Sequence, residues 1–175
     1  MLTDYFFMKM QRIVILLILL LSGPAFPATA GTEIQVPQTT DLQADAALAQ
    51  ARRLPLLIMF SLDECPYCMV VREEFLDPMQ RNSNYDNKVL MRILKMDGDY
   101  VTDFDGRRVP VDDLAVRYGA SVAPTVVLLD HRGRMLTKRL LGISTPDFYG
   151  VYLDAAIDKS LQRLHEQLTL VQYKN

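Results

Sequence analysis

Two cysteines are the side chains of this sequence best suited to chemistry. Cys65 and Cys68 are the only cysteines in the chain, and Pro66 and Tyr67 separate them. Two thiols at this spacing can form a disulfide and exchange it with a second disulfide. On a helix they lie one turn apart on the same face, so Cys68 can reach back to Cys65. The pair predicts a redox-active dithiol or, alternatively, half of a metal site.

The two thiols are predicted to have different roles. Pro66 favours a helix that begins at this point, because the first helical turn does not need the N–H that proline lacks. A thiolate at a helix start is stabilised by free backbone N–H groups and by the helix dipole. We therefore predict that Cys65 attacks a substrate disulfide and that Cys68 resolves the mixed disulfide. Asp63 and Glu64 oppose the Cys65 thiolate by like-charge repulsion, so the two effects partly cancel.

Other interpretations of the two cysteines are a metal carrier and a structural disulfide. A tetrahedral zinc site needs two further ligands, and outside residues 1–30 only His131 and His165 could join the cysteines. The acidic residues between Asp97 and Asp105 do not keep the register of a calcium loop. We therefore expect no metal and no other cofactor, with a copper carrier as the alternative. A disulfide between residues this close encloses almost no loop and adds little stability.

Helices and strands alternate around the dithiol. Strands separated by helices pair in parallel, and a closing hairpin makes such a sheet mixed. The sequence therefore predicts an α/β fold with a mixed central sheet flanked by helices. In chain order, the expected elements are a helix over 41–53, a strand over 54–60, a helix from 66 that Asp77-Pro78 breaks or restarts, a strand over 89–96, a polar stretch over 97–110, a helix over 111–118, a hairpin of 125–129 with 135–141, and a final helix from Thr145-Pro146 through Leu168.

The amino end has the pattern of a secretory signal peptide. Lys9 and Arg12 precede the apolar run Ile13–Leu21, and Ala28-Thr29-Ala30 supplies a small-residue cleavage site. The apolar run is shorter than the roughly 20 residues of a membrane-spanning helix, so we expect cleavage, with a permanent anchor as the alternative. The predicted organisation is a signal peptide over 1–30, a flexible leader over 31–40 and one domain over 41–170.

Export and charge define the expected compartment and partners. Without Asp4, Lys9 and Arg12 the chain keeps 17 basic and 20 acidic side chains, a net charge of −3, so it carries no basic excess for nucleic acid. The expected location is the periplasm, where disulfides form and persist. Expected partners are protein disulfides or dithiols and a membrane electron donor.

A second motif follows the cysteine pair after about sixty residues. Ala123-Pro124 opens the apolar stretch Thr125–Leu129, and Asp130–Gly133 and Gly142 follow. With the cysteine motif, these segments resemble the thioredoxin-like superfamily over about residues 41–168, and they are most similar to periplasmic thioredoxins of the SoxW-like type.

The resemblance implies a thiol-disulfide oxidoreductase in which the bond before Pro124 is cis and the backbone beside Ala123 pairs with a substrate chain. Pro66 and Tyr67 complete the predicted substrate-binding residues, because the Tyr67 ring should point outward at the helix start. The partial cancellation of the two effects at Cys65 predicts reduction of protein disulfides, and the alternative is a dithiol oxidase of the DsbA kind.

Two positions depart from the pattern of thioredoxins. Met59 stands six residues before Cys65, where thioredoxin carries a buried acid, and Glu64 stands where it carries an aromatic residue. The usual acceptor for the proton of the second cysteine is therefore absent. Glu64 or a water molecule is expected to take this role.

Overall fold

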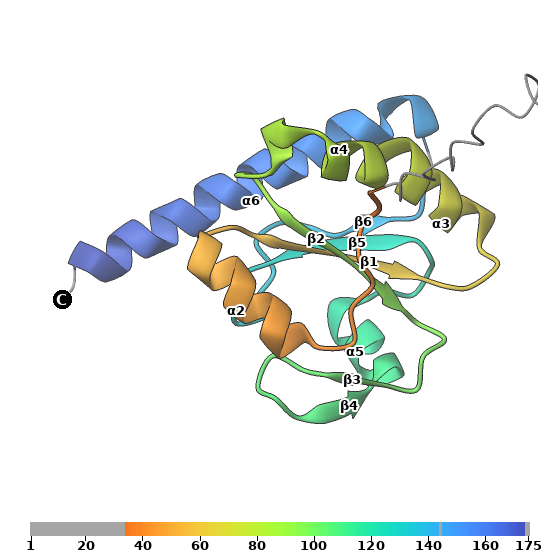
Figure 1. The fold of residues 1–175 in the computed structure, drawn as a ribbon, viewed down its shortest axis with the longest axis horizontal. Helices are drawn as coiled ribbons and strands as arrows, with labels where there is room; N and C mark the ends of the chain where they lie inside the picture. Colours follow the sequence, from red (N-terminus) through yellow and green to blue (C-terminus); the bar gives the residue numbers. More distant parts are fainter. Residues whose placement is uncertain (1–33, 144, 174–175) are drawn as a thin grey trace, which may run out of the picture. The chain divides into compact units, whose positions relative to one another are not determined.

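Four strands form one mixed sheet in the computed structural model, which describes residues 34–143 and 145–173 (Figure 1). The strands are β1 (Leu56–Ser61), β2 (Leu90–Lys95), β5 (Thr125–Leu129) and β6 (Leu140–Leu141). Their order is β2-β1-β5-β6, with β1 parallel to β2 and antiparallel to β5. All six residues of β1 are buried, as expected for an apolar strand covered on both faces. The predicted mixed sheet flanked by helices is confirmed.

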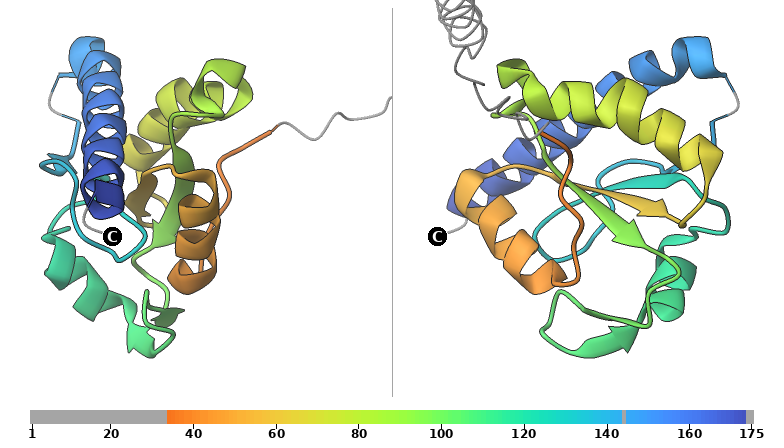
Figure 2. Two further views of the ribbon diagram at one scale, coloured as in Figure 1. Left: turned by 90° about the vertical axis from the view of Figure 1, so that its left-hand side faces the viewer. Right: turned by 45° about the vertical axis from the view of Figure 1, so that its right-hand side comes forward.

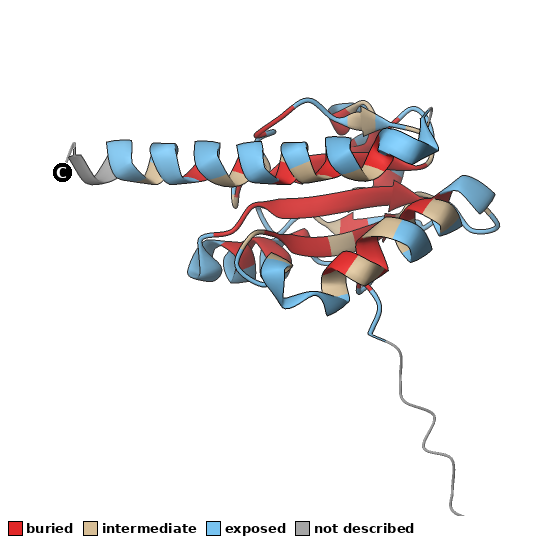
Figure 3. Ribbon diagram, turned by 90° about the horizontal axis from the view of Figure 1, so that it is seen from above, coloured by how far each residue is buried: buried red, intermediate tan, exposed pale blue. Residues whose placement is uncertain are grey.

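Helices cover both faces of this sheet (Figure 2). They are α2 (Leu42–Arg52), α3 (Pro66–Val70), the π-helix η1 (Val71–Leu76), α4 (Asp77–Arg81), α5 (Val111–Tyr118) and α6 (Pro146–Tyr173), with a short 3₁₀ helix η2 (Ser83–Tyr85) after α4. The α2 and α5 helices pack on the face formed by Leu56, Ile58 and Phe60, whereas η1 and α6 pack on the face of Leu57 and Met59. β1 and β5 are buried along their length, and in Figure 3 α6 alternates between buried and exposed residues. Alternate residues of β1 thus belong to two separate cores.

The closing hairpin is shorter than predicted. Its turn is held by Asp130, whose side chain is 1% exposed and accepts the N–H groups of Arg132 and Arg134. Gly133 has a φ of 74°, and an added Cβ would lie 2.7 Å from the Phe104 ring, so only glycine fits there. After a single bridge between Leu129 and Met135, the chain leaves the sheet and returns as β6 at Leu140. The prediction of a strand over 135–141 is therefore wrong for residues 136–139, which lie between the bridge and β6.

The stretch preceding α2 is paired with the sheet. Backbone hydrogen bonds join Thr39 N–H to Ile93 O and Ile93 N–H to Pro37 O, both at 2.9 Å. Val36 is buried, and its N–H donates to the buried carboxylate of Asp77 at 2.8 Å. The expectation of a flexible leader over 31–40 is wrong for the described residues 34–40. Their pairing depends on contacts with β2 and α4, which the local sequence does not reveal.

The helix that carries the cysteines passes through Pro78 without a break. Proline removes an N–H and crowds the carbonyl four residues earlier, which is Glu74 O in this helix. The helix widens into the π-helix η1 just before this point, and the Asp77 N–H donates to Arg72 O. A π-turn accommodates the interruption within the helix. The helix thus widens locally where a break or restart at Asp77-Pro78 was predicted. One continuous helix runs from Pro66 to Arg81.

The polar stretch after β2 forms a small hairpin of β3 (Tyr100–Thr102) and β4 (Arg108–Pro110). Its acidic residues are engaged individually, with Asp103 paired to Arg117 at 2.7 Å and Asp105 paired to Arg107 at 2.7 Å. The Arg107 N–H and guanidinium lower the pKa of Asp105. No group of three or more His, Cys, Asp or Glu side chains in the described part of the chain is arranged to hold a metal ion.

The predicted signal peptide over 1–30 lies outside the described residues. Within residues 34–143 and 145–173, no helix combines the length and apolar character needed to cross a membrane.

Tyr149 provides a test of how α6 packs. Its ring lies 5.2 Å from that of Phe75 in η1, and its buried hydroxyl has no hydrogen-bond partner among the described residues. Burial raises the pKa of Tyr149 to about 12. Because an unpaired buried hydroxyl is unfavourable, we expect Tyr149→Phe to raise the free energy of unfolding by about 1 kcal/mol at pH 7.

The same substitution should change the response to alkaline pH. The folded state keeps the Tyr149 proton up to about pH 12, whereas the unfolded chain loses it near pH 10. The stability contributed by this shift is fully present below about pH 10 and is lost as the pH rises towards 12. Urea unfolding at pH 7 and at pH 11 should therefore show a smaller alkaline loss in Tyr149→Phe than in the wild type. Tyr152→Phe, at a half-exposed position, is the control and should show neither effect. Destabilisation of Tyr149→Phe at pH 7 would contradict the prediction.

Candidate functional site

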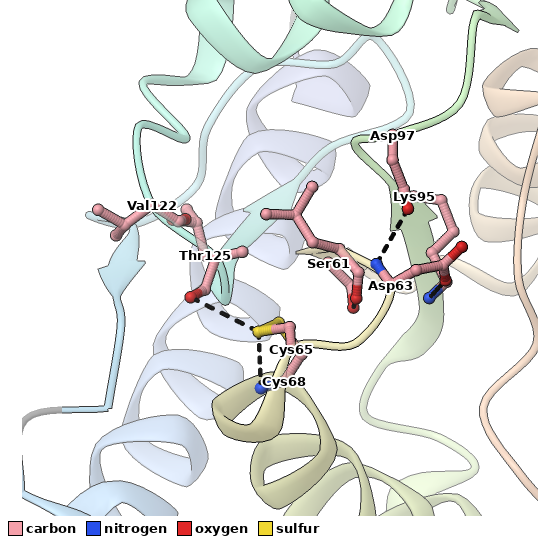
Figure 4. Close-up of a disulfide and its surroundings, with 10 residues drawn as sticks. Ser61, Asp63, Cys65, Cys68, Lys95, Asp97, Val122 and Thr125 are labelled. Atoms are coloured by element: carbon pink, nitrogen blue, oxygen red, sulfur yellow. Dashed lines mark hydrogen bonds and ion pairs between the residues drawn. A yellow bond between two sulfur atoms is a disulfide. The ribbon is translucent and has the colours of Figure 1, made fainter.

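The two cysteines form a disulfide at the start of α3, directly beyond the carboxyl end of β1 (Figure 4). Their Cα atoms are 5.2 Å apart. Cys65 is the residue before the first helical turn, and its Sγ accepts the Cys68 N–H at 3.2 Å. Cys65 is partly exposed, whereas Cys68 is 3% exposed. Cys65 is therefore the more exposed cysteine of the pair, and its role as nucleophile stays a prediction.

The loop before Cys65 is tied to the end of β2. The Asp63 N–H donates to Asp97 Oδ2 at 3.0 Å, and the Asp63 carboxylate lies 2.5 Å from Lys95 Nζ. The first of these contacts lowers the pKa of Asp97. Glu64 then adopts a left-handed backbone with a φ of 51°. The negative charge of Asp63 is thus balanced by Lys95, so the expected repulsion of the Cys65 thiolate rests mainly on Glu64.

The second predicted motif lies opposite the disulfide. The Ala123–Pro124 peptide bond is cis, and the Ala123 carbonyl oxygen is 3.9 Å from Cys65 Sγ. In the disulfide the sulfur carries no proton, so this distance is a contact, whereas a Cys65 thiol could donate a hydrogen bond to this oxygen. Thr125 anchors the loop by donating to Val122 O at 2.6 Å. The fold therefore brings together residues that are 58 positions apart in the sequence.

An apolar groove of about 310 Å³ lies beside this loop. Three of the predicted substrate-binding residues line it: Tyr67, Ala123 and Pro124. The Tyr67 side chain is 64% exposed, which agrees with an outward-pointing ring. Pro66 occupies the first turn of α3 as predicted, but it lies outside the lining of the groove.

The groove also contains residues that sequence reasoning missed. They are Val122, Leu141, Gly142 and Ile143. Val122 could have been found from its place next to Ala123. Leu141 and Ile143 carried no local signal, because their position depends on the pairing of β6 with β5.

A second, smaller pocket of about 170 Å³ lies beside both cysteines and has a polar lining. Besides the two cysteines, its lining residues are Gln38, Met59, Ser61, Leu62, Glu64, Met69, Arg72, Ile93 and Lys95. None of these residues lines the apolar groove. Gln38 was missed by sequence analysis because it was assigned to the flexible leader. The disulfide is thus flanked by an apolar groove and by a polar pocket.

The two histidines considered as metal ligands are not brought to the cysteines. His131 lies in the hairpin turn between β5 and β6, and His165 lies on an exposed part of α6. The chemistry open to the cysteine pair itself is a two-electron exchange between a dithiol and a disulfide.

Comparison with known proteins identifies the fold family. The profile of the thioredoxin-like domain matches residues 42–157, and the chain belongs to this family. The search of curated proteins found no match.

The chain is similar to several solved structures at low sequence identity. The thioredoxin of Malassezia sympodialis is 16% identical, with 73% of this chain and 95% of that chain covered and a TM-score of 0.50. Thioredoxin h of poplar is 16% identical, covering 66% of this chain and 86% of its own, with a TM-score of 0.47. Mitochondrial thioredoxin 3 of Saccharomyces cerevisiae is 19% identical, covering 70% and 92%, with a TM-score of 0.47. The thioredoxin-like fold with a cysteine pair at disulfide distance is consistent with thiol-disulfide redox chemistry.

The geometry predicts unequal reactivity of the two thiols after reduction. Cys65 is accessible and faces the Cys68 N–H, whereas Cys68 is almost fully buried. We expect Cys65 to react with iodoacetamide at least about ten times faster than Cys68 at pH 7. Peptide mass spectrometry over a time course measures both rates in one sample, and Cys68→Ala and Cys65→Ala provide the single-thiol references. Equal rates, or a faster Cys68, would show that the roles are assigned wrongly.

Proposed function

We propose that this protein is a thiol-disulfide oxidoreductase that reduces disulfides of exported proteins. The observation that carries the proposal is the sulfur of the partly exposed Cys65 at a helix start, 3.9 Å from the Ala123 carbonyl oxygen and beside an apolar groove. A helix start stabilises a thiolate, and the groove offers apolar contacts to a polypeptide next to the reacting sulfur. The family membership supports the same chemistry.

The reaction proceeds in two exchanges. The Cys65 thiolate attacks one sulfur of a substrate disulfide, forms a mixed disulfide and releases the other substrate sulfur as a thiolate. The Cys68 thiol then loses its proton and attacks Cys65 Sγ, which forms the observed disulfide and releases the second substrate thiolate. Two electrons pass from the enzyme dithiol to the substrate. A further dithiol donor must then reduce the Cys65–Cys68 disulfide.

Substrate binding is assigned to the apolar groove. The Tyr67 and Val122 side chains are 64% and 48% exposed at its rim, and Leu141 is 45% exposed. An extended substrate segment would lie along Val122 and Ala123, with backbone pairing beside Pro124, while its apolar side chains contact these residues. Pro66 holds the helix start in place, and its exposed ring is available to the substrate next to Tyr67.

The location and the electron donor are part of the proposal and rest on the sequence. Residues 1–30 have the pattern of an export signal, so we place the protein in the periplasm and its electron donor in the membrane. Without an electron donor the two thiols would be oxidised in the periplasm, since this compartment is kept oxidising. The resemblance to periplasmic thioredoxins of the SoxW-like type supports the same role.

Activity and trapping together test the proposed chemistry. The wild type should catalyse insulin reduction by dithiothreitol, and Cys65→Ala should abolish the catalysis because only the buried Cys68 thiol remains. Cys68→Ala should instead accumulate mixed disulfides on Cys65, detected as adducts that dithiothreitol releases. The control is Val116→Ala, an exposed apolar position on α5 that lines neither the apolar groove nor the polar pocket and should retain activity. Absence of reductase activity together with Cu(I) binding that survives dialysis would favour a metal carrier.

The reduction potential tests the direction of electron flow. The helix start stabilises the Cys65 thiolate, Glu64 opposes it, and Lys95 balances Asp63. Because no unpaired cation lies immediately before or between the cysteines, we expect a potential of about −270 to −180 mV. Equilibration with glutathione buffers followed by alkylation measures this value. A value near that of the strong oxidant DsbA, about −120 mV, with the cysteines recovered oxidised from cells, would indicate an oxidase instead.

A further inference from the structure

The polar pocket contains one carboxylate. Both cysteines line this space of about 170 Å³, and Glu64 is the only acidic residue among its lining residues. We propose that Glu64 accepts the proton of Cys68 when Cys68 resolves the mixed disulfide. This inference rests on the proposed oxidoreductase function and assigns the proton acceptor of its second step.

Cys68 needs such an acceptor because it is buried. Only 3% of the residue is exposed, and a thiol attacks a disulfide as the thiolate. Met59, which is 1% exposed, forms part of the pocket wall and offers no basic atom. The buried Ser61 hydroxyl already faces the Leu62 carbonyl at 3.4 Å. The polar pocket is therefore a route from the Cys68 sulfur to an ionisable group.

The two cations that line the polar pocket with Glu64 form ion pairs with other carboxylates. Lys95, from β2, is paired with Asp63 at 2.5 Å. Arg72, from η1, is paired with Glu73 at 2.9 Å and lies 3.7 Å from Asp77. Glu64 itself forms no ion pair with the described residues. Its carboxylate is therefore free to take up a proton.

A water molecule can connect the two groups. The pocket volume exceeds the roughly 30 Å³ that one water occupies in the liquid several times over. The Cys68 proton would pass to Glu64, directly or through this water, as the Cys68 thiolate forms. The Cys68 sulfur then bonds to Cys65 Sγ, the bond from Cys65 to the substrate sulfur breaks, and the substrate thiolate leaves. Glu64 finally returns the proton to the solvent or to the leaving thiolate, so atoms and electrons balance.

A chromogenic disulfide separates the two steps. The reduced protein reacts with 5,5′-dithiobis(2-nitrobenzoate) and releases one coloured thiolate when Cys65 attacks and a second when Cys68 resolves. Stopped-flow absorbance from pH 6 to pH 10 gives both rates, and Cys68→Ala isolates the first. The variants are Glu64→Gln, Glu64→Asp and, as a matched loss of one exposed carboxylate in the helix that follows the cysteines, Glu74→Gln.

The proposal predicts that Glu64→Gln slows the second release about ten-fold at pH 7 and shifts its pH profile upward, with rates converging near pH 10. Glu64→Asp should recover part of the rate, and Glu74→Gln should behave as the wild type. A purely electrostatic role of Glu64 predicts the opposite sign, because removal of a negative charge favours a nearby thiolate. A second release in Glu64→Gln that is unchanged or faster would overturn the inference and leave the proposed function intact. A wild type that shows no second release would overturn the proposed function itself.

Discussion

The site depends on the hydrogen bond from the Cys68 N–H to Cys65 Sγ at the end of a buried strand. This contact exists only if the helix starts at Pro66, one residue after the sulfur that it stabilises. The start is fixed because β1 is paired on both sides, with β2 and with β5, and delivers the chain to a constant point. A shift of β1 by one residue would exchange its two faces between separate cores. The pairing register of β1 in the sheet thus fixes the position of Cys65 Sγ.

The disulfide has different surroundings on its two sides, and this asymmetry suits its two chemical steps. The apolar groove beside Ala123 lies next to the accessible Cys65, where a substrate must approach. The polar pocket reaches the buried Cys68, where a proton must leave. A substrate in the groove therefore does not need to displace the proton acceptor. The two steps can use separate parts of the molecule.

Sequence alone predicted the parts of the fold that depend on local patterns. The helix over Val111–Tyr118 and the buried strand before the cysteines follow from apolar runs and turn residues. The place of Pro124 at the site followed instead from the resemblance to thioredoxin-like proteins. The pairing of residues 37–39 with β2 escaped prediction because no local period marks it. The π-helix escaped because a proline pattern cannot distinguish a break from a local widening. Gln38 and Ile143 were also missed, because long-range strand pairing brings each of them to its pocket and no local pattern marks such pairing.

The location of the carboxylate follows from the neighbours of Met59. In the sheet register Met59 pairs with Ile93 and Val126, so a carboxylate at that position would lie between two apolar residues at the buried wall of the polar pocket. A buried charge without a partner is strongly unfavourable, and the cation on the adjoining strand, Lys95, is already bound to Asp63. A carboxylate in the loop avoids this difficulty, because Glu64 remains exposed to water while lining the polar pocket. The apolar residue at 59 and the acidic residue at 64 are therefore two parts of one arrangement, in which the ionisable group lies outside the core.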